Sequence, residues 1–433
     1  MQNRLNRVID STLLFYLYSI CNDPMKILVL NAGSSSQKSC LYDLLDHGEV
    51  NTLDMDLPQP IWEAMIDWTA QEGQGLLIVK ANGIKKNIQL SNGDRLAGIT
   101  TMLNTLQTGD TQVVETLQEI DRVGHRVVHG GSYYSEATQI TPAVKAVIKQ
   151  LIPLAPTHNP AHLEGIEAIE KILGTVPQIA VFDTAFHTTI PPAAAFYAIP
   201  QAWTDMGIYR YGFHGTSHKF CAQQTAKILH QSLANLKIIT CHIGNGASLT
   251  AIKNGLSIDT TMGFTPLEGL MMGSRSGSID PAILIYLMQE KGFTAEQLNH
   301  LLNKESGLKG VSGLSTDLRV ILQAIKNGNE QAERALEMYI HRFRACVGQM
   351  LASLGGLDVL VFTAGVGENS AIVREKVCAG FTFLGLKLDL EKNAQSPLNE
   401  DIATPDSTIR ILVIHTEEDW AIAQECWQFN LAE

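Results

Sequence analysis

The chain has 433 residues, of which 45% are hydrophobic, so it can bury substantial cores and is expected to form two domains. Its 44 acidic and 32 basic side chains give a formal charge of −12. This balance argues against nucleic acid as a partner, because affinity for a phosphate backbone needs clustered lysine and arginine. Seven scattered cysteines without a CxxC pair argue against a disulfide framework or a zinc ribbon, and favour a reduced, cytoplasmic location.

The first 24 residues contain an apolar run, STLLFYLYSIC at 11–21, that faintly resembles a signal peptide. The run is too short to span a membrane. We expect residues 1–24 to be an N-terminal extension, either a poorly ordered tail or the product of an upstream start, with a targeting signal as the alternative. No other stretch is long and apolar enough to be transmembrane, so no membrane partner is expected.

Alternating strand and helix patterns follow. Short runs rich in valine, isoleucine and leucine predict strands buried on both faces, at 26–30, 178–182, 237–243, 358–363 and 410–414. Helical patterns with capping residues or terminating glycines predict helices at 143–151, 161–173 and 329–354. This alternation predicts an α/β fold, in which ligands bind beyond the carboxyl ends of the strands.

Two loops of small residues, half a chain apart, each follow a predicted strand. The first is NAGSSSQK at 31–38 and the second is HIGNGAS at 242–248. Backbone N–H groups in such loops can approach a phosphate, and Lys38 can add a contact. Two such units suggest a duplicated nucleotide-binding fold. A third loop, GVGEN at 365–369, also follows a predicted strand, and for any one loop an ordinary turn is the alternative.

The motifs of four common enzyme classes are absent from the sequence. It has no Walker loop, no GxGxxG after a strand, no HExxH and no GxSxG.

Two arginines stand in unusual surroundings. Arg126 lies inside an apolar stretch, and Arg275 lies in a glycine- and serine-rich segment with no acidic neighbour. The planar guanidinium binds carboxylate or phosphate through two parallel hydrogen bonds and stays charged, so these two side chains can grip an acyl phosphate. A structural ion pair is the alternative for each.

Asp183 ends a predicted strand, His214 sits in a glycine-flanked turn, and an acidic segment, TEED, follows the last strand at 416–419. A histidine in such a turn can hydrogen-bond a phosphoryl group in transit. Acidic residues at a strand end suit Mg²⁺, with an acidic first helical turn as the alternative. The remaining histidines near these motifs are expected to be structural: His125, His129, His158, His187 and His218.

The motifs N-x-G-S-S-S-x-K and H-x-G-x-G-x-S, with the segments HRVVHGG, FDTAFH, YGFHGTSH, MGFTPLEGLMMGSRSG and GVGEN, resemble those of acetate kinases over residues 25 to about 423. The resemblance implies an α/β fold of two duplicated actin-like, ribonuclease H-like lobes with a nucleotide cleft between them. The N-terminal lobe would comprise 25–183, completed by about 416–433, and the C-terminal nucleotide-binding lobe 184–415.

The resemblance also implies reversible transfer of the ATP γ-phosphoryl group to acetate, giving acetyl phosphate and ADP. Mg²⁺ would be the cofactor, with Mn²⁺ as a substitute, and the chain would form a homodimer. Acetate is already a nucleophile at neutral pH, so the catalytic task is to bring two anions together and neutralise the moving charge.

The resemblance assigns roles residue by residue. His214 and Arg275 would stabilise the transition state, and Asp183 would be an acid–base or, more plausibly, a positioning carboxylate. The substrate-binding residues would be Arg126, Val128, Phe213 and Pro266. The metal would be supported by Asn31 and Glu418. The ATP-binding residues would be Lys38, His242, Ile243, Gly244, Asn245, Gly246, Asp317, Leu318, Arg319, Gly365, Val366, Gly367, Glu368 and Asn369.

Two positions depart from the family pattern. Thr157 stands where a leucine is usual, which enlarges the expected acyl pocket and favours tolerance of propionate. TEED replaces the more frequent TNEE beside Glu418, so the residue that assists Glu418 is left open. A propionate or butyrate kinase of the same family is therefore the nearest alternative, and an actin-like ATP-binding switch is a more distant one.

Overall fold

A computed structural model describes residues 24–33, 36–44, 57–71, 74–91, 94–156 and 158–431. The expected N-terminal extension and Thr157 therefore lie outside the described residues, apart from residue 24. The chain divides into two compact units. The first comprises Met1–His125, Glu164–Ile179 and Ala423–Glu433, and the second Arg126–Leu163 and Ala180–Ile422. The lobe boundaries expected from the sequence stay a prediction.

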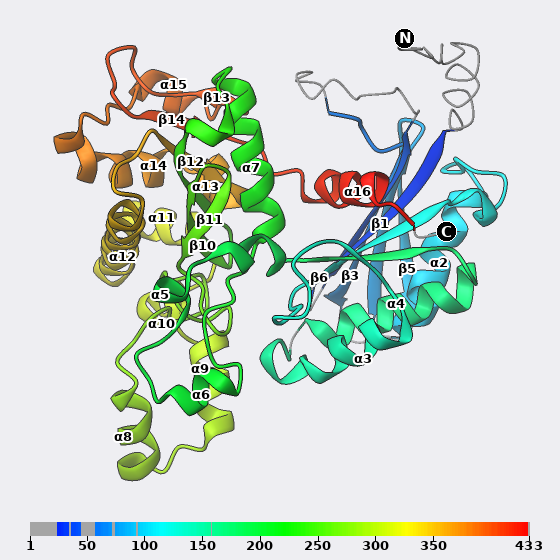
Figure 1. Ribbon diagram of the computed structural model, residues 1–433, viewed down its shortest axis with the longest axis horizontal. Helices are drawn as coiled ribbons and strands as arrows, with labels where there is room; N and C mark the ends of the chain where they lie inside the picture. The colour runs from blue at the N-terminus through cyan, green and yellow to red at the C-terminus, as the bar shows by residue number, and fades with distance from the viewer. Residues whose placement is uncertain are drawn as a thin grey trace, which may run out of the picture. The chain divides into compact units, whose positions relative to one another are not determined.

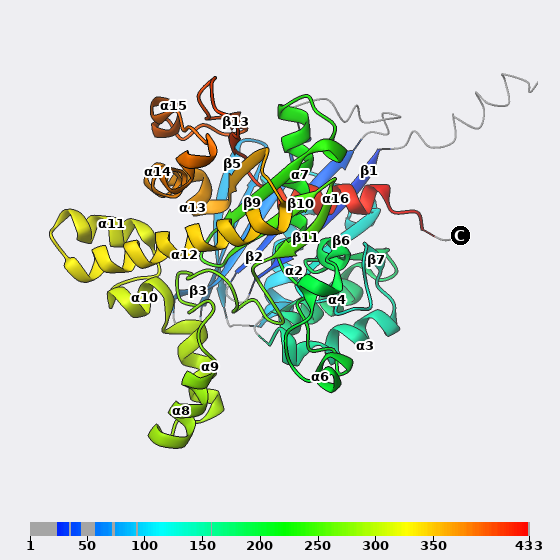
Figure 2. The same ribbon diagram turned by 60° about the vertical axis from the view of Figure 1, so that its left-hand side comes forward.

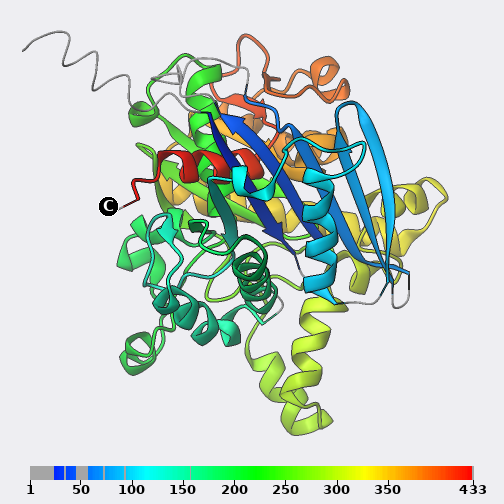
Figure 3. The ribbon, with the colours of Figure 1, turned by 90° about the vertical axis from the view of Figure 1, so that its right-hand side faces the viewer.

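The first unit is built on an antiparallel meander joined to parallel strands (Figure 3). Its strands belong to a sheet of order β5-β4-β3-β2-β1-β6-β8-β7, of which β7 and the last residues of β6 and β8 are assigned to the second unit. The strands are β1 (Met25–Ala32), β2 (Ser36–Leu44), β3 (Trp62–Gln71), β4 (Gln74–Ala81), β5 (Ile84–Ser91), β6 (Arg122–Val127), β7 (Thr138–Gln139) and β8 (Gln178–Phe182). Helix α2 (Arg95–Gln107) packs on β3 and β4, where the indole N–H of Trp62 donates a hydrogen bond to Thr105.

The second unit holds a sheet of order β11-β10-β9-β12-β14-β13, flanked by α7 on one side and α12 on the other (Figures 1 and 2). The strands are β9 (Lys237–Ile243), β10 (Ala247–Lys253), β11 (Leu256–Thr260), β12 (Val359–Thr363), β13 (Glu400–Asp401) and β14 (Arg410–Val413). The helices are α5 (Pro192–Ala195), α6 (Gln201–Asp205), α7 (Gly215–Ile228), α8 (Ala282–Lys291), α9 (Ala295–Lys304), α10 (Gly307–Ser312), α11 (Leu318–Lys326), α12 (Glu330–Leu354), α13 (Ala364–Asn369), α14 (Ala371–Cys378) and α15 (Leu390–Ala394).

Three further helices complete the description: α3 (Pro142–Gln150), α4 (Asn159–Leu173) and α16 (Glu418–Gln428). The short 3₁₀ helices are η1 (Leu117–Glu119), η2 (Ile152–Leu154), η3 (Ala185–Thr189), η4 (Leu233–Asn235) and η5 (Ala379–Leu384). No helix in the described part of the chain is long and apolar enough to cross a bilayer.

The two sheets repeat one topology. The order β3-β2-β1-β6-β8 of the first matches β11-β10-β9-β12-β14 of the second. In both, an antiparallel hairpin is followed by a parallel pairing, β1 with β6 and β9 with β12. The predicted duplicated α/β fold is thereby confirmed. The described residues of the first small-residue segment belong to the β1–β2 hairpin, and the second segment belongs to the equivalent β9–β10 hairpin.

The predicted strands and helices are confirmed within a residue or two of their ends. Thr141 caps α3 by accepting a hydrogen bond from the backbone N–H of Val144. Asn329 caps α12, which ends at Gly355 with φ 63°. One expectation was wrong: residues 365–369 form the short helix α13 rather than a loop.

Candidate active site

His214 lies at the junction between β8 and α7. Asp183 follows β8, and its carbonyl oxygen accepts a hydrogen bond of 2.9 Å from the backbone N–H of Gly215, the first residue of α7. A Cβ on Gly215 would lie 2.3 Å from that oxygen, so only glycine allows this close approach. His214, just before it, has φ 57°, which is rare for a non-glycine residue. The helix start is thus locked to the strand end, and His214 is held in a fixed position.

Arg126, which is partly buried, forms an ion pair with the buried Asp183. The Arg126 Nη2 and Nε atoms donate to the Asp183 carboxylate at 2.7 and 3.0 Å. Burial raises the pKa of Asp183 and the Arg126 charge opposes that shift, while the carboxylate raises the pKa of Arg126 above its ordinary value. The ion pair that was the alternative interpretation of Arg126 is therefore present. Asp183 fixes the orientation of the guanidinium.

Glu418, at the start of α16, lies beside this pair. Its carboxylate is 3.8 Å from Arg126 Nη1 and 4.0 Å from His242 Nδ1. In the described residues, no group of three or more histidine, cysteine or acidic side chains gathers as a preformed metal cage. Mg²⁺ is usually held by one or two carboxylates together with water and phosphate oxygens, so the oxygen donors of Glu418 fit that cation.

The imidazole of His242 stacks on that of His214, with ring centroids 4.1 Å apart. Its Nδ1 atom is 2.9 Å from the hydroxyl of Ser217, which is itself 2.9 Å from the hydroxyl of Thr416. These contacts join the end of β9 to α7 and to the segment that precedes Glu418.

Arg275 and His214 converge on the hairpin that connects β9 and β10. A Cβ placed on Gly246 would lie 3.3 Å from Arg275 Nη1 and 3.7 Å from His214 Nε2. Arg275 donates to the Pro266 carbonyl oxygen at 3.0 Å and, within the described residues, forms no ion pair. Burial lowers the pKa of Arg275. A partly buried cation without a carboxylate partner favours an anionic ligand at this hairpin.

The segment that carries Pro266 is held by Arg210, which sequence reasoning missed. Arg210 donates to the carbonyl oxygens of residues 260–262 and, at 2.9 Å, to Glu268. Glu268 also accepts from the Tyr197 hydroxyl. This clamp positions the carbonyl to which Arg275 donates.

Two of the apolar residues expected to line the acyl pocket, Val128 and Phe213, are buried in the same hydrophobic cluster. The ring of His129 packs edge-on to that of Phe213, with ring centroids 5.4 Å apart. His187 Nε2 donates to the Phe213 carbonyl oxygen at 2.9 Å, in the structural role expected of it. Thr157, the departure from the family pattern, is not among the described residues.

His158 was set aside from the sequence, yet it lies near both arginines. Burial and, to a smaller extent, the positive charges of Arg126 and Arg275 together lower the pKa of His158 to about 4. No periodicity or motif near His158 signals this proximity, because the arginines are distant in sequence.

The residues expected to bind ATP lie on several different elements of the structure. Asp317 caps α11 by accepting from the backbone N–H of Arg319 at 2.9 Å, and their side chains pair at the surface. Leu318 is buried. Asn31 and Lys38 lie in the first unit, on β1 and β2, where they are paired in register.

The side chain of Glu368 is buried and belongs to the helix α13, so it does not project from a loop. Its carboxylate accepts from the backbone N–H groups of Ala364 at 2.8 Å and Thr416 at 3.2 Å, and lies 2.7 Å from His415 Nδ1. Asn369 donates to the carbonyl oxygen of Gly365. Glu368 therefore links α13 to the segment that leads to Glu418.

The buried histidines predict a pH-dependent stability. Burial lowers the pKa of His125, His129 and His187 to about 4, and those of His214 and His218 well below the ordinary value. The unfolded chain protonates these groups near pH 6.5, so between about pH 6.5 and 4 it binds more protons than the folded chain. The free energy of unfolding should therefore fall as the pH falls through this window.

Urea unfolding at about pH 7.5 and 5.5 measures this effect as a lower midpoint at the lower pH. His300→Gln, at a side chain that is 64% exposed, should keep the same difference. An unchanged or higher midpoint at the lower pH would contradict the prediction.

Comparisons with known proteins agree with this geometry. The profile of the Acetokinase family matches residues 26–424. The acetate kinase of Rippkaea orientalis is 69% identical over 93% of this chain and 98% of its own length, and that of Synechocystis sp. is 66% identical over 94% and 98%. The crystal structure of Porphyromonas gingivalis acetate kinase matches with a TM-score of 0.83 at 42% identity, covering 93% of this chain and 99% of that one.

A propionate kinase structure from Francisella tularensis subsp. tularensis matches with a TM-score of 0.84 at 39% identity, covering 94% of this chain and all of that one. The repeated sheet topology, the histidine and arginine over the glycine hairpin, and these matches over nearly the whole sequence lead to one assignment. The chain belongs to the acetokinase family.

Proposed function

We propose that the chain catalyses reversible transfer of the γ-phosphoryl group of ATP to acetate, giving acetyl phosphate and ADP. The observation that carries this proposal is the convergence of Arg275 and His214 over Gly246. The guanidinium of Arg275, which is partly buried and has no carboxylate partner in the described residues, and the neutral imidazole of His214 both lie close to the position of Gly246. Such a donor pair suits the oxygens of a phosphoryl group in transit.

The proposed chemistry is a direct in-line transfer. A carboxylate oxygen of acetate forms a bond to the γ-phosphorus while the bond to the β–γ bridging oxygen of ATP breaks, and that oxygen leaves on ADP. Acetate needs no base, so the protein's task is to position two anions and to neutralise charge. Arg126, oriented by Asp183, would bind the acetate carboxylate, and Val128, Phe213 and Pro266 would surround its methyl group.

Mg²⁺ is proposed as the cofactor, with Mn²⁺ as a substitute. Glu418 and Asn31 would support the metal, since carboxylate and amide oxygens are suitable ligands. When bound, the cation neutralises phosphate charge and orients the nucleotide. The nucleotide itself would contact Lys38, the hairpin at 242–246, the start of α11 and α13.

Propionate is the second candidate acceptor. The similarity to the Francisella propionate kinase and the threonine at 157 favour some tolerance of one additional methylene. A methylene difference changes discrimination by only about 1–3 kcal/mol, so a shifted preference is expected rather than a switch.

Formation of acyl hydroxamate from ATP, hydroxylamine and each of acetate, propionate and butyrate tests this proposal. Acetate should give the highest kcat/KM, with propionate second. Absence of product with all three acids would overturn the kinase assignment. A rate of ATP hydrolysis that does not depend on the added acid would favour the actin-like switch. Highest kcat/KM with propionate or butyrate would reassign the acceptor.

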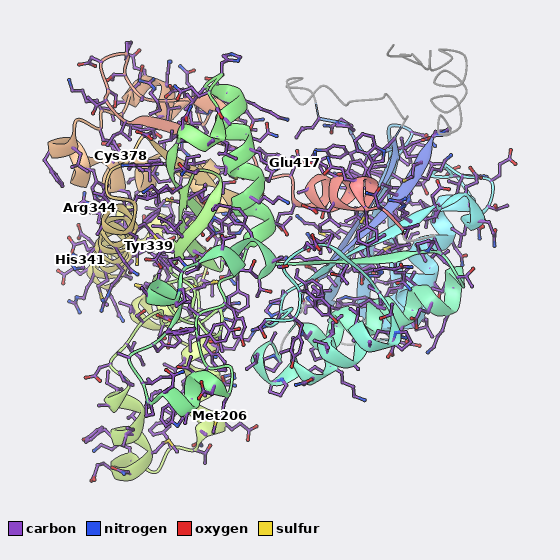
Figure 4. All side chains as sticks on the ribbon, in the orientation of Figure 1. Met206, Tyr339, His341, Arg344, Cys378 and Glu417 are labelled. Carbon is purple, nitrogen blue, oxygen red and sulfur yellow. The ribbon has the colours of Figure 1, made fainter. Side chains whose placement is uncertain are left out.

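A homodimer is also proposed, supported by an apolar helix on the surface. No residue of α8 is buried, and the helix projects from the remainder of its unit (Figures 1 and 2). The apolar side chains exposed on α8 are Ile283, Ile285, Tyr286 and Met288, and Ile279 is exposed just before the helix. Met206, just after α6, is a further exposed apolar side chain and is labelled in Figure 4. A surface of this kind suits burial against a second copy.

Sedimentation velocity should therefore show a dimer for the wild type and a monomer for Ile285→Glu, because a charge would be buried in the contact. Leu256→Glu is the matched control, since its side chain is 52% exposed on β11 against 56% for Ile285. A monomeric wild type, or equal effects of the two variants, would contradict the prediction.

A cytoplasmic location is proposed on the chemistry of the thiols. The six cysteines among the described residues are all free, and five of them are buried. Free thiols in this number are typical of a reducing compartment.

A further inference from the structure

His218 lies one helical turn beyond His214 on α7 and is completely buried. Both of its ring nitrogens contact hydroxyl groups. Nδ1 is 2.7 Å from Thr240 Oγ1, and Nε2 is 2.8 Å from Ser248 Oγ. Ser248 Oγ is in turn 2.8 Å from His214 Nδ1. Four side chains therefore form one continuous hydrogen-bonded chain that ends at His214.

Two arrangements of the protons give the hydroxyl hydrogen of the fully buried Ser248 an acceptor within this hydrogen-bonded chain. Burial keeps the pKa of both His214 and His218 well below the ordinary value, so both rings are neutral and each carries one N–H. The single hydroxyl hydrogen of Ser248 points either to His214 or to His218. In the first arrangement His214 carries its hydrogen on Nε2, and in the second it carries it on Nδ1.

Thr240 decides between the two arrangements. Its side chain is fully buried, and within the described residues its hydroxyl contacts only His218 Nδ1. In the first arrangement Thr240 donates to that nitrogen, His218 Nε2–H donates to Ser248, and Ser248 donates to His214. In the second arrangement His218 donates to Thr240, and the buried Thr240 hydroxyl has no acceptor. An unsatisfied buried donor is costly, so the first arrangement is favoured.

We infer that His218 is a positioning residue that acts through Ser248 to hold His214 in the tautomer protonated at Nε2. This inference rests on the proposed function. The Nε2 atom is the one that faces the Gly246 position beside Arg275. His214 therefore presents a hydrogen-bond donor, rather than a lone pair, to the phosphoryl oxygens. In the opposite tautomer His214 would repel those oxygens while occupying the same place.

Two substitutions at His218 separate this role from simple packing. His218→Gln keeps an amide N–H that can donate to Ser248, whereas His218→Leu fills similar space with no donor. His218→Leu should lower kcat by about 100-fold, the effect of losing one transition-state donor, with KM for acetate and ATP little changed. His218→Gln should retain most of kcat. Equal losses in both folded variants, or full activity of His218→Leu, would overturn the inference.

A double-variant cycle tests the route through Ser248. Ser248→Ala should lower kcat about as far as His218→Leu, and the double variant should be no worse than either single one. Additive losses in kcat would overturn the proposed route, because His218 would then act independently of Ser248.

The wild-type enzyme supplies a test that needs no His218 variant to fold. The ¹⁵N shifts of histidine ring nitrogens distinguish protonated from unprotonated atoms, and the His214 signals are assigned by their loss in His214→Gln. Nε2 of His214 should be protonated and Nδ1 unprotonated; the reverse would overturn the inference. A wild type that forms no acyl phosphate would overturn the proposed function instead, and the spectrum would still decide the tautomer.

Discussion

Replacement of Arg275 by alanine is expected to lower kcat by about 10²–10³-fold, because a charged donor aimed at the moving phosphoryl group is lost. KM for acetate should change little. The folded protein should keep its stability or gain some, because burial disfavours the Arg275 charge and no carboxylate in the described residues forms an ion pair with it. A loss of activity without a loss of stability distinguishes a functional arginine from a structural one.

Steady-state kinetics and urea unfolding of the same preparations measure both quantities. Arg275→Lys should fall between wild type and alanine, since an ammonium keeps the charge but not the planar pair of donors. Arg334→Ala, on the exposed side of α12, is the matched control and should leave kcat unchanged. An Arg275→Ala variant that unfolds readily and keeps its turnover when folded would contradict the prediction.

Replacement of Asp183 by alanine is expected to destabilise the protein by about 1.5–3 kcal/mol, because the partly buried Arg126 would lose the two hydrogen bonds that it donates to this carboxylate and keep the longer contact, at 3.8 Å, with Glu418. The guanidinium would also lose its fixed orientation, so KM for acetate should rise. Asp183→Asn keeps the shape of the side chain but removes the charge, and its effect on stability should be smaller.

Removal of both partners gives the control. Arg126→Met combined with Asp183→Ala should recover part of the lost unfolding free energy, since the Arg126 charge is removed together with its bidentate partner, while Glu418 loses its contact with Arg126 and activity stays low. Urea unfolding provides the stabilities. A single alanine variant as stable as the wild type would show that the ion pair does not support the fold. Asp183→Asn with most of the wild-type kcat would exclude an essential role in the transfer step.

The regular elements could be predicted because their signals are local. The run at 237–243 is apolar on both faces and becomes β9, and the Thr141–Pro142 signal marks the start of α3. The small-residue segments at 31–38 and 242–248 were recognised because their glycines and serines stand directly after such runs, but the antiparallel pairings of β1 with β2 and of β9 with β10 were not predicted. Local signals of this kind survive folding, since tertiary contacts reinforce them.

The features that could not be predicted depend on contacts between segments that are distant in the sequence. His158 lies near Arg126 and Arg275, and His218 reaches Ser248, but no spacing in the sequence encodes either approach. The glycines at 365 and 367 favoured a loop, yet α13 forms there. The Glu368 carboxylate caps the N–H of Ala364, and the buried Arg374 donates to the carbonyl oxygens of residues 367 and 368.

The Glu368 carboxylate has a consequence for any attempt to redesign this protein. It holds α13 through Ala364 and the approach to Glu418 through Thr416, so one side chain sets the spacing between two segments to which different ligands are assigned. Glu417, in the second of these segments, is labelled in Figure 4. On the proposed roles of α13 and Glu418, a substitution in α13 that displaces Glu368 is therefore expected to change the metal dependence together with the nucleotide preference.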